Sequence, residues 1–225
     1  MDKKLIINAR KPKGELGSQM IEKMNESHEK LARWGGISHL DIENNDIILD
    51  IGCGGGVNVK RFSEMTPNGK IYGLDYSELS VEKSEHFNKT AIKEGKVEII
   101  QGSVSKLPFE DETFNIVTGF ETVYFWPDFI EDLKEVNRVL KKDGKIFICN
   151  EAAGEEHILE KMSDYIELLD MKIYSENDLK SALNDSNFVD INIFKKDEGN
   201  NWICAIATKK NKNLYFYYFT FVYCA

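Results

Sequence analysis

The sequence has few cysteines and prolines, and it has no long apolar run. Its 225 residues include four cysteines and four prolines. No two cysteines have the spacing of metal ligands, so we expect no metal in the site. No signal-peptide-like segment follows the basic N-terminus, and no segment is long and apolar enough for a membrane-spanning helix. These absences predict a cytoplasmic protein without an integral membrane segment.

Positive charge is also scarce. The chain carries 38 acidic and 29 basic residues, which gives a net charge of −9. A large nucleic-acid footprint needs clustered lysine and arginine to neutralise phosphates, so we expect no nucleic-acid partner. Hydrophobic residues make up 42% and charged residues 30%, as in globular proteins. The length suggests one domain with a small addition.

From residue 46 onward, strand-like and helix-like segments alternate. Strands are expected at residues 46–51, 70–75, 96–102, 113–120 and 145–150, and helices at 57–65, 78–95 and 128–140. This alternation indicates a parallel sheet with helices on both faces. Ser175 and Asp178 form a capping-box pattern that opens a further helix, and strands at 188–194 and 201–208 follow it. We therefore predict an α/β fold: a doubly wound, mostly parallel, seven-stranded, Rossmann-like sheet with a C-terminal antiparallel hairpin.

Two segments lie outside this core, which spans residues 41–208. Residues 1–40 contain a helical pattern at 15–34, and they form a separate N-terminal segment. Residues 209–225 are rich in aromatic side chains and are either an extra strand or a disordered end.

The glycine-rich stretch "ILDIGCGGGVN" at residues 48–58 marks a ligand site, because backbone without side chains can approach a ligand closely. A phosphate-binding loop needs Lys and Ser or Thr after the last glycine, but Val57 and Asn58 stand there. A dinucleotide fingerprint needs a third glycine at position 57, where valine again fails. Asp50 would repel a pyrophosphate, whereas it could receive an ammonium group. The residues thus favour a cationic ligand.

Three segments together carry a family resemblance. "LDIGCGGG" resembles motif I of class I S-adenosylmethionine-dependent methyltransferases, and "IYGLDYS", which ends in Asp75-Tyr76-Ser77, is similar to their second motif. "QGSVSKLPFEDETFNIV" resembles the segment from their third strand through their fourth, and it is most similar to the ubiquinone- and menaquinone-methyltransferase branch. The resemblance covers residues 46–208, which it identifies as a methyltransferase core, and it implies that residues 1–40 form a helical lid.

The resemblance implies S-adenosyl-L-methionine as the cofactor. Asp75 would accept hydrogen bonds from the ribose hydroxyls, Tyr76 would pack on the adenine, and Asp50 would balance the positive end. The region of Ser103 would meet the adenine amino group, although many members have Asp at that position. The implied cofactor-binding residues are Asp50, Gly52, Cys53, Gly54, Gly56, Asp75, Tyr76, Ser103, Val104 and Glu121.

The segment "GFETVYFWPDF" should face the transferred methyl group. It lacks the Asn/Asp-Pro-Pro-Tyr/Phe pattern used on nucleic-acid amines and on amides, which argues against those acceptors. Tyr124 is the predicted substrate-facing hydroxyl, and His28 in the lid is the predicted base or orienting group. Asn25, Trp34, Tyr124 and Trp126 are the predicted lining of the substrate pocket.

The predicted function is methyl transfer from S-adenosylmethionine to a small-molecule acceptor by direct displacement. A lipid-quinone carbon methyltransferase and a non-catalytic cofactor-binding module remain alternatives. Val57 disfavours a nicotinamide oxidoreductase, and the placement of the cysteines disfavours the arsenic-methylating branch. The acceptor atom and the oligomeric state do not follow from the sequence.

Overall fold

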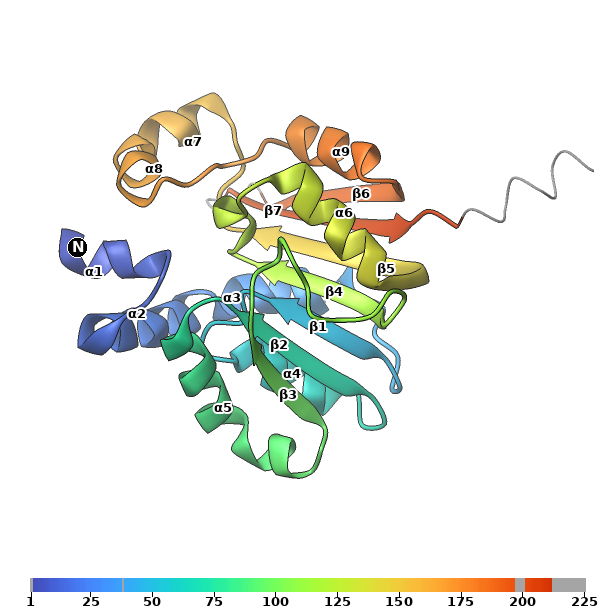
Figure 1. Ribbon diagram of the computed structural model, residues 1–225. Coiled ribbons are helices and arrows are strands. Elements are labelled where there is room, and N and C mark those ends of the chain that lie inside the picture. Colours follow the sequence, from blue (N-terminus) through green and yellow to red (C-terminus); the bar gives the residue numbers. More distant parts are fainter. Residues whose placement is uncertain (1, 38, 197–200, 212–225) are drawn as a thin grey trace, which may run out of the picture.

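A computed structural model of the chain describes residues 2–37, 39–196 and 201–211. A seven-stranded sheet forms its centre, in the order β3-β2-β1-β4-β5-β7-β6 (Figure 1). The strands are β1 (Ile47–Ile51), β2 (Lys70–Asp75), β3 (Val97–Gln101), β4 (Phe114–Phe120), β5 (Leu140–Asn150), β6 (Phe188–Lys196) and β7 (Trp202–Lys209). The first five strands pair in parallel, and β7 lies antiparallel between β5 and β6. The predicted fold class is confirmed.

Helices cover both faces of the sheet. They are α1 (Lys3–Ile6), η1 (Ile7–Ala9), α2 (Gly14–Ser27), α3 (Glu29–Ala32), η2 (Arg33–Ile37), α4 (Val57–Met65), α5 (Glu78–Lys93), η3 (Val123–Phe125), α6 (Phe129–Val139), α7 (Glu156–Lys161), α8 (Ser163–Leu169) and α9 (Glu176–Asp185). Apolar residues of α6 and α9 share one core cluster with the sheet, and those of α3 and α4 share the other. The side chains of Ser77, Asp128 and Ser175 cap α5, α6 and α9.

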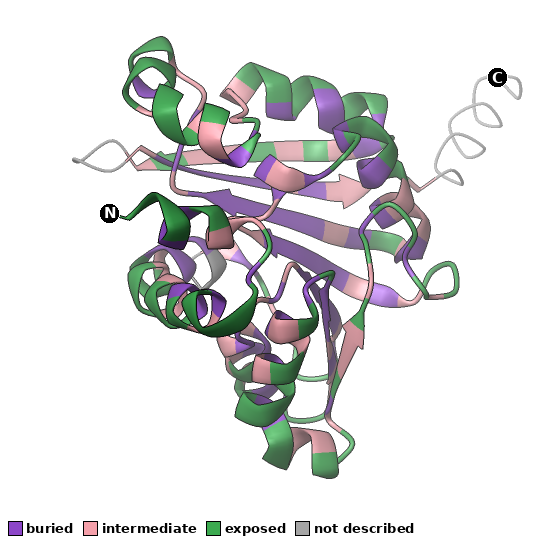
Figure 2. Cartoon of the chain, turned by 60° about the vertical axis from the view of Figure 1, so that its left-hand side comes forward, coloured by how far each residue is buried: buried purple, intermediate pink, exposed green. Residues whose placement is uncertain are grey.

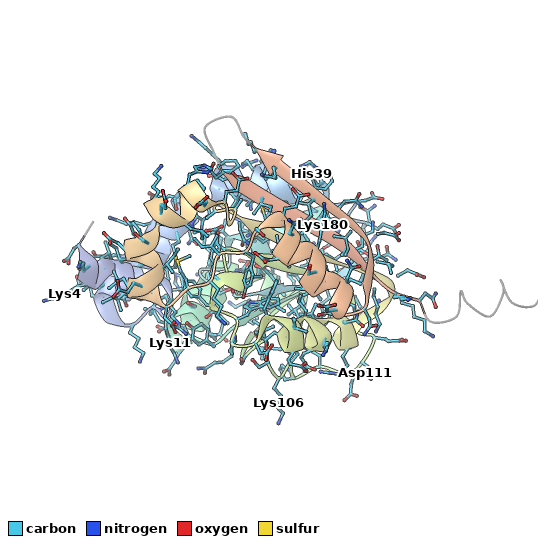
Figure 3. All side chains as sticks on the ribbon, turned by 90° about the horizontal axis from the view of Figure 1, so that it is seen from above. Lys4, Lys11, His39, Lys106, Asp111 and Lys180 are labelled. Carbon is cyan, nitrogen blue, oxygen red and sulfur yellow. The ribbon has the colours of Figure 1, made fainter. Side chains whose placement is uncertain are left out.

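The core is deepest along the central strands, which appear almost continuously buried in Figure 2. Ile48 and Leu49 of β1 are fully buried and point to opposite faces, so each anchors one cluster. Burying each such side chain contributes roughly 1.5–3 kcal/mol. Exposed charged residues such as Lys106 point away from the ribbon in Figure 3, whereas Asp50 and Asp75 are buried. The rigid centre therefore fixes where the strand ends, and the loops after them, are placed.

The prediction of a continuous helix over residues 15–34 is wrong in detail. The chain instead forms α2, a break at His28, α3 and the π-helical turn η2. Glycine at position 35 permits a close approach to the sheet, because a Cβ there would collide with the Cys149 sulfur atom. These N-terminal helices lie beside the end of the sheet to which the parallel strands point (Figure 1).

Two further differences concern β5 and the segment after it. The strand begins at Leu140 rather than at residue 145, and it passes through a register shift opposite β4. Asp143 has a positive φ of 62° within this irregular stretch, so the turn-like residues belong to a bulged strand. Helices α7 and α8 occupy a region for which the sequence predicts no element.

The structure describes nearly all of the predicted N-terminal segment but only the first residues of the predicted aromatic tail. No helix within residues 2–37, 39–196 and 201–211 is both long and apolar enough to cross a membrane. The predicted aromatic tail lies largely outside the described residues, which end at 211. The division into lid, core and tail stays a prediction.

Candidate active site

A cavity of about 270 Å³ opens at the carboxyl ends of the parallel strands. Its wall comes from the glycine-rich loop after β1, the turn after β2, the segment after β4 and the N-terminal helices. Open α/β sheets bind ligands at this edge, because the loops after neighbouring parallel strands meet there.

The glycine-rich loop is shaped by its left-handed backbone. Gly52 and Gly54 have φ values of +71° and +52°, which favour glycine. A Cβ at Gly52 would collide with the side chain of Thr122, whereas a Cβ at Gly54 would meet open space. Gly54 therefore exposes its backbone in the wall of the cavity. Gly56 serves packing instead, because a Cβ there would strike Ser84 and Asn88 of α5.

Asp75 lies at the end of β2 and is held by backbone donors. Its Oδ2 accepts a hydrogen bond from the Gly54 N–H at 2.9 Å, and its Oδ1 accepts one from the Ser77 N–H at 2.9 Å. Burial raises the pKa of this carboxyl, and the backbone donors oppose that rise. Each carboxylate oxygen has a second lone-pair direction, so the fixed group can still accept hydrogen bonds from a ligand.

The N-terminal segment closes over the same turn. The hydroxyl of Ser77 donates to the Pro12 carbonyl at 2.9 Å, and the hydroxyl of Tyr76 donates to the Arg10 carbonyl. Tyr76, Arg10 and Pro12 all line the cavity. The segment before α2 is thus tied to the loop after β2 at the rim of the site.

Asp50, near the end of β1, is a buried acid directly before the glycine-rich loop. It is 2% exposed, and its carboxylate accepts a hydrogen bond from the Thr118 hydroxyl at 2.7 Å. Burial raises its pKa to about 7, with a smaller opposing effect from that hydrogen bond. Arg61, whose guanidinium donates to the Asn58 amide oxygen, lines the same cavity. This end of the cavity therefore offers one acidic and one basic group.

A second group of titratable side chains, at the segments after β4 and β5, consists of an imidazole that faces two acidic side chains. The His28 Nε2 atom lies 4.0 Å from Glu121 Oε2 and 4.0 Å from Glu151 Oε2. Burial lowers the pKa of His28 to about 4, so its ring is uncharged at neutral pH. Burial, and then the neighbouring Glu151, raise the pKa of Glu121 to about 8.

Glu121 is held from behind by Tyr124. The buried Tyr124 hydroxyl donates to Glu121 Oε1 at 3.2 Å and accepts from the Ala152 N–H at 3.1 Å. Glu121 itself has a left-handed backbone with φ of 56°, and its N–H donates to the Cys149 carbonyl at 3.0 Å. The sharp turn after β4 thus directs this carboxylate toward His28.

The structure brings most of the predicted site residues together. The cavity wall includes Asn25, His28, Asp50, Gly52, Cys53, Gly54, Asp75, Tyr76, Ser103, Val104, Glu121 and Trp126. Tyr124 lies behind this wall, and Trp34 packs against Trp202 with ring centroids 5.7 Å apart. The functional roles of all these residues stay predictions.

Sequence reasoning missed Arg61, Thr122 and Glu151. Arg61 lies one helical turn after Asn58, so its position at the start of α4, directly after the glycine-rich loop, could have indicated it as a site residue. Glu151 directly follows β5, and a polar residue at a strand end was a second signal. Thr122 left no signal, because its contact with Gly52 depends on the pairing of β1 with β4, which are far apart in the sequence.

The cavity fits a cofactor with a charged amino-acid end and a ribose. Asp50 and Arg61 offer opposite charges to the former, and the anchored Asp75 suits the latter. The buried indole N–H of Trp126, which also lines the wall, has no hydrogen-bond partner among the described residues. Together with the sheet order, these features define the class I methyltransferase architecture.

The comparisons with known proteins identify the family. The profile of a methyltransferase domain matches residues 42–214, so the chain belongs to that family. Over 173 residues it is 29% identical to YrhH of Bacillus subtilis (strain 168), a methyltransferase by its name. The aligned region covers 77% of this chain and 83% of YrhH. The chain is therefore an S-adenosylmethionine-dependent methyltransferase with S-adenosyl-L-methionine as its cofactor.

Two other similarities are more distant or partial. The chain is 37% identical over 120 residues to demethylmenaquinone methyltransferase of Bacillus mycoides, covering 51% of this chain and 48% of that one. It spans about half the length of this relative. A solved structure of geranyl diphosphate C-methyltransferase from Streptomyces coelicolor, in complex with Mg²⁺, geranyl diphosphate and S-adenosyl-L-homocysteine, superposes with a TM-score of 0.68 at 13% identity. It covers 88% of this chain and 85% of that one, and this likeness shows the fold.

Proposed function

We propose that this enzyme methylates a small-molecule acceptor by direct displacement. One observation carries the proposal: a single cavity runs from the glycine-rich loop and Asp75 to His28 and Glu121. When bound, S-adenosylmethionine supplies the activated methyl group. Because an in-line displacement depends on orientation and exclusion of water, the protein needs to hold both partners in one closed space.

Asp75 and its neighbours hold the nucleoside end in this proposal. The Asp75 carboxylate accepts hydrogen bonds from both ribose hydroxyls, since backbone N–H groups already fix its orientation. Tyr76 covers one face of the adenine, and Ser103 and Val104 border its edge. The tie between Ser77 and Pro12 keeps the N-terminal segment over this end and excludes water.

Asp50 and Arg61 hold the amino-acid end. The Asp50 carboxylate balances an ammonium group, and the Arg61 guanidinium pairs with a carboxylate. The sign of each charge matches the end of the ligand that it would meet. Arg61 is half buried beside Asn58, so the pair is partly shielded from solvent.

The acceptor occupies the remaining end, between the N-terminal helices and the segment after β4. His28 and Trp126 line the cavity, and the Asn25 side chain, which also lines it, lies against Gly55 of the glycine-rich loop. The uncharged imidazole of His28 can accept a hydrogen bond or a proton from the acceptor. Tyr124 acts through Glu121, which it orients, rather than by touching the acceptor.

A methyl-transfer screen tests the proposal. The full chain is incubated with S-adenosylmethionine labelled in the methyl group and with fractionated low-mass metabolites. The proposal expects label in a low-mass product, and it expects the label to disappear when Asp75→Ala replaces the natural chain. Cofactor binding without transfer to any fraction would favour a binding module instead.

Carbon methylation of a lipid quinone is a second candidate. The partial match to demethylmenaquinone methyltransferase of Bacillus mycoides favours it. Partition of the labelled product between an organic and an aqueous phase separates the two candidates. Label that extracts with the lipids would support the quinone acceptor, and label retained in water would exclude it.

A further inference from the structure

We propose that His28, Glu121 and Glu151 form a binding site for a divalent first-row transition-metal ion at the acceptor end of the cavity. One imidazole nitrogen and two carboxylate oxygens lie mutually within 4.8 Å in this cluster. The His28 Nε2 atom is 4.0 Å from an oxygen of each glutamate. Such a mixed nitrogen and oxygen donor set is typical of transition-metal sites.

The three ligands come from three separate elements. His28 caps the C-terminus of α2, Glu121 follows β4, and Glu151 follows β5. The two strands are paired in parallel, so their carboxyl ends place both glutamates side by side. The N-terminal segment then brings the imidazole over them, and the site exists only when that segment is docked.

The carboxylate of Glu121 is oriented as a metal ligand would be. Its Oε1 atom accepts hydrogen bonds from the Tyr124 hydroxyl and from the Glu151 N–H, which leaves Oε2 facing His28. Ala152 in turn donates its N–H to the Tyr124 hydroxyl. Outer hydrogen bonds of this kind fix the ligating atoms and tune their basicity.

Charge also favours a cation here. In the ion pairs of the described part of the chain, Glu121 and Glu151 have His28 as their basic partner and no lysine or arginine. A divalent ion among these three donors would supply the cationic partner that the two acidic side chains lack in the described part of the chain. The side chains of His28, Glu121 and Glu151 are 28%, 15% and 37% exposed, so an ion can enter from solvent.

The donor set points to Zn²⁺ or Mn²⁺ rather than Ca²⁺ or Mg²⁺, because imidazole suits transition metals. Metal–ligand distances of about 2.1 Å place tetrahedral donor atoms about 3.4 Å apart, so donor atoms that lie within 4.8 Å of one another need to move closer by about 1 Å. Three protein ligands leave at least one coordination position open. That position would take an oxygen, nitrogen or sulfur donor of the acceptor. With the ion bound, His28 Nε2 would be a ligand, and only without the ion could the same atom accept a hydrogen bond or a proton.

This role for the ion rests on the proposed methyl transfer, whereas its binding can be tested alone. Zn²⁺ is titrated into the chelator-treated full chain by calorimetry, and Co²⁺ absorption reports the coordination. His28→Ala and Glu151→Gln are the test variants. His157→Ala is the matched control, because His157 pairs with one glutamate, Glu155, at 3.8 Å on the surface.

We expect one Zn²⁺ per chain with micromolar or tighter affinity, about tenfold or more weaker in each test variant and unchanged in His157→Ala. Circular dichroism of each variant checks folding. Equal affinity in the natural chain and both test variants, or Zn²⁺ binding only at millimolar concentration, would overturn the site. S-adenosylmethionine binding is measured in parallel: if it persists while Zn²⁺ fails to bind, only the metal site is lost.

Discussion

The two ends of the cavity are built differently. At the cofactor end, Asp75 and Asp50 each accept hydrogen bonds from fixed donors, the Gly54 and Ser77 amides and the Thr118 hydroxyl. At the acceptor end, His28 meets two carboxylates at 4.0 Å, too far for a hydrogen bond. The first end is organised in advance, whereas the second leaves ligand-binding capacity open.

The difference follows from how each end is assembled. The cofactor end comes from the neighbouring parallel strands β2, β1 and β4 and the short loops after β1 and β2. The acceptor end needs the N-terminal segment to dock on the turns after β4 and β5. We therefore expect variants at the first end to change cofactor affinity and variants at the second to change turnover.

The largest effect is expected for Asp75→Ala. Loss of two hydrogen bonds to a charged group should weaken S-adenosylmethionine binding about 100-fold, or roughly 3 kcal/mol. Calorimetry on the full chain measures this. Asp75→Asn controls for folding, since the amide keeps the shape of the side chain. Unchanged cofactor affinity in Asp75→Ala would contradict the proposal that this residue binds the ribose.

His28→Ala should lower turnover about tenfold or more with cofactor affinity changed by less than about threefold. In the proposed division of the cavity, His28 faces the acceptor, whereas Asp75 and Asp50 hold the cofactor. Single-turnover rates and a cofactor titration on the same preparation separate the two effects, with His86→Ala on the exposed face of α5 as a control. A loss confined to cofactor affinity would contradict the division of the cavity.

Cofactor binding should weaken about tenfold between pH 8 and pH 6, because Asp50 has a pKa of about 7 and only its charged form balances an ammonium group. Asp50→Asn should bind weakly at both pH values. A titration series across this range measures the change, and a flat profile for the natural chain would refute the pairing.

The buried Asp50 carboxyl should also lower the free energy of unfolding of the enzyme without cofactor. Its pKa is raised above the unfolded value, so stability falls as pH rises from about 4 to about 7. Asp50→Asn should therefore raise the free energy of unfolding at pH 8 by roughly 1–3 kcal/mol. Urea denaturation of both proteins without cofactor tests this, and equal midpoints would contradict it.

The smallest effect is expected for Tyr124→Phe. The change removes the hydroxyl that orients Glu121 and accepts from Ala152, so unfolding should become easier by about 1–2 kcal/mol. Turnover should fall only about threefold, because Glu121 keeps the hydrogen bond from the Glu151 N–H. A loss as large as that of His28→Ala would make Tyr124 a catalytic residue.

The elements around the proposed cofactor end could be predicted from the sequence for a physical reason. Local patterns determine strands, caps and left-handed glycines, and the acid after each strand is adjacent to them in the chain. The capping box of α9 and the antiparallel placement of β7 were predicted on the same local grounds and are confirmed.

The acceptor end could be predicted only in part, because its residues meet through tertiary packing. The turn η2 places residue 35 against Cys149 of β5, a contact between segments far apart in the sequence. Glu151 joins the cluster through the pairing of β4 with β5. No local pattern marks such contacts, and the helical periodicity of residues 15–34 does not indicate the break at His28.

A crystal structure of the full chain with S-adenosyl-L-homocysteine tests the central claim most directly. The account predicts the ribose hydroxyls on the Asp75 carboxylate, the ammonium group at Asp50, and the sulfur atom facing His28 and Glu121. A cofactor whose ribose lies away from Asp75, or whose sulfur faces away from that cluster, would contradict it.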